Sequence, residues 1–120
     1  MEVPSWVREL FDSIDRKDAR AFASFLTEDA RFRYGSQAMI QGKSAIEKFV
    51  AGYFASLQTI RHTIEEVWSA DQGNTWFIEG TVEYTLAKGR SVQVPFLNHF
   101  SMQEGRIRDY LVFTDPTPLR

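Results

Sequence analysis

The sequence contains no cysteine, which excludes disulfides, thiolate metal ligands and a cysteine nucleophile. Its two histidines, His62 and His99, are too far apart in the sequence to form a known metal-binding motif. The glycine-rich patterns that bind nucleotide phosphates are absent as well. We therefore expect a protein that uses neither a metal ion nor another cofactor.

Long apolar runs and a surplus of positive charge are also lacking. No run approaches the roughly 20 apolar residues that span a bilayer. The N-terminal stretch MEVPSWVRELF has neither the basic nor the apolar region of a secretion signal. A net charge of −2 predicts no binding to nucleic acid or to anionic membranes. These absences favour a cytoplasmic protein.

Aromatic side chains, in contrast, are abundant: ten Phe, four Tyr and three Trp in 120 residues. The length suits a single domain, residues 1–120, with a core of its own. So many aromatic residues fit a wide cavity or a large interface as well as a packed core.

The first half of the chain has helical periodicity. Apolar residues recur at three- and four-residue spacing over residues 5–14 and, most strongly, over residues 43–57. Asp18 is a suitable N-cap for a second, short helix between them. The alternating segment 30–34 predicts a short strand.

From Thr59 onward the pattern changes to that of strands. Gly73, Gly89 and Gly105 occupy three turn sequences at equal spacing, which predicts four long antiparallel strands in a meander. Helices followed by strands predict an α+β fold, with about three N-terminal helices on one face of a curved, mainly antiparallel sheet. The strand from Trp76 to Tyr84 is apolar on both sides, so we also expect an exposed apolar face that forms a homodimer through the sheet.

A histidine interrupts the apolar side of the segment TIRHTIEEVW. Strand alternation places Ile60, His62, Ile64 and Trp68 on one face. His62 is then either a core residue bonded to a backbone carbonyl or a neutral base that lines a pocket. The sequence leaves both interpretations open.

Three segments, DRKDARAFASFLTEDARFRY, IQGKSAIEKFV and VPFLNHFSMQEGRIRDYLVFTD, resemble the nuclear transport factor 2-like superfamily, specifically its SnoaL-like and ketosteroid isomerase-like members. With the expected strand order, the resemblance covers nearly the whole chain. It implies a cone in which the helices close one face of the sheet around a deep, mostly apolar pocket. The superfamily includes cyclases, isomerases, dehydratases, epoxide hydrolases and proteins that only bind or transport, so the resemblance implies no single reaction.

The residues that catalyse two of these reactions are replaced here. Where ketosteroid isomerases have a carboxylate base and a strand acid, this sequence has Tyr34 and Asn98. The Asp-Arg-Asp set of limonene epoxide hydrolases falls on Glu79, Thr81 and Val112 and is therefore missing.

Scytalone dehydratase resembles the sequence better. That enzyme has an aspartate just before a Lys-Asp pair, a tyrosine at the end of the first strand and a histidine early on the second, which correspond to Asp15, Tyr34 and His62. The resemblance implies that His62 is a base whose tautomer Asp15 fixes, and that Tyr34 donates to a substrate oxygen. The alternative for Tyr34 is an aromatic wall of the cone. A second catalytic histidine of that enzyme is missing.

Four more residues are expected to line the pocket, namely Glu79, Phe96, Asn98 and Tyr110. Asn98 shares a strand face with Phe96, and a buried amide must find a partner, so it is suited to orienting a substrate carbonyl. The resemblance also turns Glu79 inward, either as an acid or base or as the partner of an arginine on the last strand.

These observations predict an enzyme without a cofactor that transfers protons on a small hydrophobic, oxygenated substrate such as a polyketide, steroid or terpenoid. Isomerisation, dehydration and cyclisation all suit the residues. The main alternative is a non-catalytic dimeric protein that binds an apolar ligand. A third possibility is an interaction module whose cone is filled by its own aromatic side chains.

Overall fold

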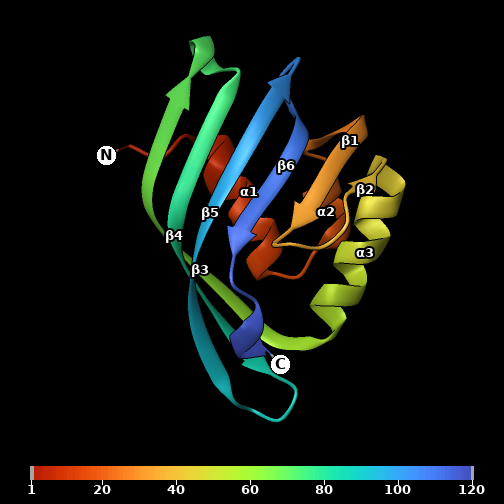
Figure 1. Cartoon of the computed structure of the whole chain (residues 1–120), viewed down its shortest axis with the longest axis vertical. Helices are drawn as coiled ribbons and strands as arrows, with labels where there is room; N and C mark the ends of the chain where they lie inside the picture. Colours follow the sequence, from red (N-terminus) through yellow and green to blue (C-terminus); the bar gives the residue numbers. More distant parts are fainter. Residues whose placement is uncertain (1, 120) are drawn as a thin grey trace.

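One curved, unclosed sheet of six strands carries three helices on its inner face (Figure 1). The computed structural model describes residues 2–119. The helices are α1 (Ser5–Asp15), α2 (Ala19–Ala23) and α3 (Lys43–Ala55), with short 3-10 turns η1 (Asp71–Gly73) and η2 (Thr117–Leu119). The strands are β1 (Leu26–Tyr34), β2 (Ile40–Gln41), β3 (Leu57–Ala70), β4 (Thr75–Leu86), β5 (Ser91–Gln103) and β6 (Arg106–Thr114). The expected α+β fold is confirmed.

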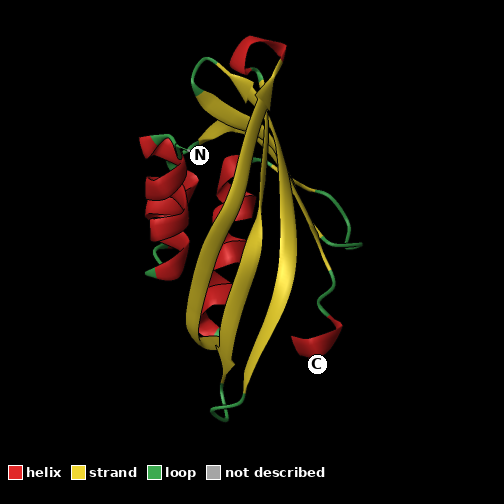
Figure 2. Ribbon diagram, turned by 90° about the vertical axis from the view of Figure 1, so that its left-hand side faces the viewer, coloured by secondary structure: helices red, strands yellow, loops and turns green. Residues whose placement is uncertain are grey.

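Strands β3 to β6 form the antiparallel meander that the glycine turns predicted. The order across the sheet is β2-β1-β6-β5-β4-β3, so β1 lies beside β6 and pairs with it in parallel. Figure 2 shows the long strands bending around the helices. β1 begins at Leu26, four residues before the predicted start at Ala30. The sequence pattern did not predict this first part of the strand, because the segment 27–29 is polar and shows no apolar alternation.

A β-bulge in β3 sends Trp68 to the outer face of the sheet. The register of β3 against β4 shifts between Ile64 and Glu66, and beyond the shift Trp68 pairs with Phe77. Trp68 is 47% exposed. The prediction that Trp68 shares a face with His62 is therefore wrong, because one extra residue reverses the alternation of a strand.

Gly80 makes room for the bulge. It lies opposite Ile64, and a Cβ atom at this position would stand 2.0 Å from the backbone oxygen of Thr63 and 3.1 Å from the ring of Phe96. The backbones of β3 and β4 therefore approach more closely here than a side chain allows. Because a bulge bends its strand, this contact contributes to the curvature that closes the cone.

Helices α1 and α3 cover the inner face through their apolar sides. The buried apolar residues are Val7, Leu10, Phe11 and Ile14 on α1 and Ile46, Val50 and Phe54 on α3. They pack against the inner residues of the sheet, of which Ile78, Phe100 and Ile107 are fully buried. No helix within residues 2–119 is long and apolar enough to cross a membrane.

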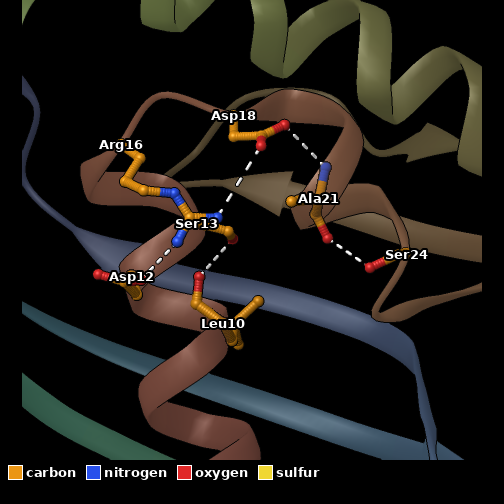
Figure 3. Close-up of polar contacts among 7 residues, drawn as sticks. All are labelled: Leu10, Asp12, Ser13, Arg16, Asp18, Ala21 and Ser24. Carbon is orange, nitrogen blue, oxygen red and sulfur yellow. Dashed lines mark hydrogen bonds and ion pairs between the residues drawn. The ribbon is translucent and has the colours of Figure 1, made fainter.

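The turn between α1 and α2 fixes where α1 ends (Figure 3). The backbone N–H of Asp18 donates to the oxygen of Ser13 at 2.9 Å, and the Asp18 side chain caps α2 by accepting from Ala21 at 3.0 Å. Between them Lys17 takes a left-handed conformation (φ 59°), and its Nζ donates to the oxygen of Leu57 at 2.8 Å. These contacts hold Asp15, the last residue of α1, against the start of β3.

A charged cluster on the outer face fastens β1 to β6. Asp109 is 6% exposed and accepts from Arg31 at 2.8 Å and from Arg108 at 3.2 Å. Burial raises the pKa of the Asp109 carboxyl, but the hydrogen bonds from both arginines outweigh burial and hold the pKa below its ordinary value. The cluster therefore stabilises the fold near neutral pH, and this contribution is lost as the pH falls through the lowered pKa.

The close approach at Gly80 predicts opposite effects for two glycine substitutions. Gly80→Ala should lower the free energy of unfolding by about 1–3 kcal/mol, because the backbone of Thr63 cannot move away without disturbing the bulge. The matched control is Gly52→Ala in α3, where nothing lies within 4 Å, and it should raise the free energy of unfolding by about 0.5–1 kcal/mol. Urea denaturation measures both, and equal stability of the two variants would contradict this account.

Candidate functional site

A cavity of about 60 Å³ lies between the helices and the inner face of the sheet. Its lining is mainly aromatic and aliphatic. Five of the six residues that the sequence placed on the pocket line this cavity: Tyr34, His62, Phe96, Asn98 and Tyr110.

The prediction that Glu79 points into the cavity is wrong. Its neighbours in β4, Ile78 and Gly80, are buried, and Glu79 is exposed on the outer face. Strand alternation alone gives this result, and the register taken from the epoxide hydrolases misplaced the residue. Glu79 also forms no ion pair with an arginine of the last strand among residues 2–119, and Arg108 binds Asp109 instead.

His62 and Asp15 make two contacts at one end of the cavity. Nδ1 of His62 lies 2.6 Å from Oδ1 of Asp15, and the backbone N–H of His62 donates to Oδ2 of Asp15 at 3.1 Å. The side chains are 11% and 27% exposed, respectively. A carboxylate only accepts hydrogen bonds, so Nδ1 carries the proton that faces Asp15, and in the neutral form of the ring Nε2 is left as an acceptor.

Two phenylalanines pack against the ring of His62. Phe11 of α1 and Phe96 of β5 contact it edge-on, with ring centroids 4.9 Å and 5.2 Å away. Aromatic contacts of this geometry are favourable and restrict rotation of the ring. Because His62 lines the cavity, its arrangement suits a proton acceptor of fixed orientation.

Three tyrosine hydroxyls meet at the cavity wall. The hydroxyl of Tyr34 on β1 lies 3.3 Å from that of Tyr53 on α3 and 3.4 Å from that of Tyr84 on β4. Burial, together with the neighbouring hydroxyls, raises the pKa of Tyr53 and of Tyr84 above the ordinary range, so both remain protonated donors. We name these three residues the tyrosine cluster.

Sequence reasoning missed Tyr53 and Tyr84 as site residues. Tyr53 belongs to the apolar stripe of α3 and Tyr84 to the apolar side of β4, where each reads as a core aromatic. Nothing in the spacing of the two residues reveals that their hydroxyls meet, since α3 and β4 are brought together only by the fold.

Asn98 is the buried amide of the cavity. It is 3% exposed, and its Oδ1 has no hydrogen-bond partner among residues 2–119. A buried polar atom without a partner is costly, and such atoms are rare in folded proteins. The described part of the chain also contains no cluster of acidic or histidine side chains that could hold a metal ion.

The family of the chain is shown by a match to the model of the SnoaL-like domain over residues 7–110. The chain belongs to the SnoaL-like domain family. This confirms the resemblance seen in the sequence. No curated protein matches the sequence.

Solved structures share the fold at low sequence identity. A candidate polyketide cyclase from Xanthomonas campestris has a TM-score of 0.82 at 19% identity, covering 96% of this chain and 91% of its own. A protein of ketosteroid isomerase-like fold from Catenulispora acidiphila, in complex with trimethylamine, has a TM-score of 0.84 at 16% identity and coverages of 93% and 86%. An epoxide hydrolase-like protein from M. tuberculosis has a TM-score of 0.78 at 15% identity and coverages of 92% and 80%. At these identities the likeness shows the fold alone.

Proposed function

We propose that this SnoaL-like protein is an enzyme without a cofactor that moves protons on a small oxygenated substrate, with His62 as the base. The observation that carries the proposal is the contact of 2.6 Å between Nδ1 of His62 and Asp15 at the wall of an apolar cavity. The carboxylate fixes the tautomer, stabilises the imidazolium that forms and leaves Nε2 to accept a proton.

The reaction begins at a carbon next to a carbonyl group. Nε2 of His62 removes a proton from this carbon, the electron pair of the C–H bond forms a double bond to the carbonyl carbon, and the π pair of the carbonyl group moves to its oxygen to give an enolate. A hydroxyl of Tyr34 or Tyr84 stabilises the developing negative charge. Return of the proton at another carbon completes an isomerisation, loss of hydroxide from the neighbouring carbon a dehydration, and attack on a second carbonyl a cyclisation.

A non-catalytic protein that binds an apolar ligand is the alternative. The lining of the cavity favours it, because aromatic and aliphatic side chains bind apolar compounds without any chemistry. In that case the Asp15–His62 contact would serve only to tie α1 to β3. A cytoplasmic location is a further proposal, which rests on the sequence alone.

Exchange of carbon-bound protons distinguishes the enzyme from the binding protein. The wild-type protein should catalyse exchange of the α-protons of small ketones such as cyclohexanone in D₂O, measured by ¹H NMR. His62→Gln should slow this exchange by roughly 10²–10⁴-fold, because the base is lost while the size of the side chain is nearly kept.

Asp15→Asn should act in the same direction but more weakly, since an amide can also donate to Nδ1 and thereby release the tautomer. Full exchange by a folded His62→Gln variant would contradict the proposed catalysis. Proton exchange no faster with the wild-type protein than without it would contradict the proposal as well. Either result would leave ligand binding as the function.

We also propose that the protein forms a homodimer through the outer face of the sheet. A row of side chains crosses five strands there, formed in order by Trp68, Phe77, His99, Leu111 and Arg33. The rings of Phe77 and His99 stack at 4.8 Å. We name these five residues the outer row; Trp68 is exposed and the other four are half-buried. Accessible aromatic and aliphatic surface of this kind is typical of a protein interface.

The ends of the outer row complement each other. Arg33 lies 5.5 Å from the ring of Phe113 beside it, and its Nε is buried without a hydrogen-bond partner among residues 2–119. A two-fold axis through His99, parallel to the strands, brings Arg33 opposite Trp68 of the partner subunit. A guanidinium on an exposed indole ring is a favourable pair, so a second copy of the chain fits this face.

Replacing Phe77, next to the centre of the outer row, should break the dimer. Phe77→Arg places a charged side chain opposite Leu111 of the partner subunit, where the interface would bury the charge without a partner, and should give a monomer, whereas the wild-type protein should sediment at twice 13.9 kDa at micromolar concentration. Lys48→Glu on the exposed side of α3 is the control and should remain dimeric. A monomeric wild-type protein would contradict the proposed assembly.

A further inference from the structure

The cavity is small for the substrates that its relatives suggest. Its volume of about 60 Å³ suffices for a few water molecules, whereas a dry cavity of roughly 150 Å³ encloses one benzene ring, so a single ring is enclosed here only in part. The cavity is partly open to solvent, so a ligand can project outward. A row of fused rings nevertheless cannot enter, because five aromatic rings occupy the interior: Phe22, Phe32, Phe54, Phe96 and Tyr110.

The tyrosine cluster offers a hydrogen bond that the protein itself does not use. Each hydroxyl brings one proton, and the contacts of Tyr34 with Tyr53 and with Tyr84 use two of the three. Tyr34 and Tyr84 line the cavity, and Tyr53 does not. The third proton is therefore free to be donated to an oxygen atom of a ligand at the cavity wall. Such a ligand would extend the chain of hydrogen bonds among the three hydroxyls, in which each bond strengthens the next.

Asn98, on the same inner face, needs a hydrogen-bond donor, whereas the tyrosine cluster needs an acceptor. Its Oδ1 is an acceptor without a donor, in a side chain that is 97% shielded from solvent, since Asn98 is 3% exposed. Cross-strand pairing places Asn98 beside Val112, and Val112 beside Tyr34. The Cα atoms of Asn98 and Tyr34 are thus separated by two strand spacings, or about 10 Å, which is the span of one small ring between two side chains.

We propose that the cavity takes an oxygenated compound of no more than one ring, whose carbonyl oxygen accepts from the tyrosine cluster and whose hydroxyl group donates to Asn98. This inference rests on the proposed function only in taking the cavity as the ligand site. It excludes steroids and fused-ring polyketides, which the likeness in fold alone would suggest.

Binding of three ketones tests both the size and the two polar contacts. The ¹H–¹⁵N NMR spectrum of the protein, including the side-chain amide of Asn98, is recorded during titration with cyclohexanone, 3-hydroxycyclohexanone and the four-ring androst-4-ene-3,17-dione. We expect the hydroxylated ring to bind about three- to tenfold more tightly than cyclohexanone, because it alone satisfies Asn98. The steroid should leave the cavity residues unshifted.

Variants show how much of the binding affinity comes from Asn98 and how much from the tyrosine cluster. Asn98→Leu should bring the affinities for the two single rings within twofold of each other. Tyr84→Phe should weaken both about three- to tenfold, and Tyr53→Phe should have the same effect but smaller, since its hydroxyl acts only through Tyr34. Ser13→Ala, which removes a buried hydroxyl outside the cavity, should change neither affinity.

The proposal is overturned if the steroid binds more tightly than either single ring, or if 3-hydroxycyclohexanone does not bind at millimolar concentration. Unchanged binding by the folded Tyr84→Phe and Tyr53→Phe variants would also overturn it. Because binding is read from chemical-shift changes and not from reaction rates, each of these results leaves the role of His62 standing. Conversely, full proton exchange by His62→Gln would remove the catalytic proposal without affecting the ligand class.

Discussion

The site depends on one contact, the pair of hydrogen bonds between Asp15 and His62. One carboxylate oxygen faces the imidazole Nδ1 and the other accepts the backbone N–H of His62, so the last residue of α1 is bound to both the ring and the backbone of β3. The α1–α2 turn holds Asp15 in place, and the rings of Phe11 and Phe96 restrict His62. The contact therefore joins helix to sheet and leaves a single ring nitrogen for chemistry.

Much of the fold follows from local patterns in the sequence. The stripe of α3, the three glycine turns and the alternation of β4 and β5 predict helices on a meander, because each depends on neighbours within one element. The placement of His62, Phe96 and Asn98 on the cavity follows from the same alternation. Features that depend on a second element are different. The bulge that turns Trp68 outward requires the close approach of Gly80, which only the paired strands show.

The candidate site shows the same limit. Asp15 was connected with His62 only through the resemblance to a dehydratase, and Glu79 was misplaced by a similar transfer from an epoxide hydrolase. The tyrosine cluster combines residues of α3, β1 and β4, so no local pattern in the sequence predicts it. The size of the cavity is also a property of packing, since it depends on how far the aromatic side chains fill the cone.

The protonation of the His62 ring tests the central claim most directly. Two-bond ¹H–¹⁵N correlation spectra of the wild-type protein near neutral pH report which ring nitrogen carries the proton. We expect the proton on Nδ1, facing Asp15, and a bare Nε2, and we expect this preference to weaken in Asp15→Asn. A ring protonated on Nε2 would leave no acceptor in the cavity and would contradict the role of His62 as the base.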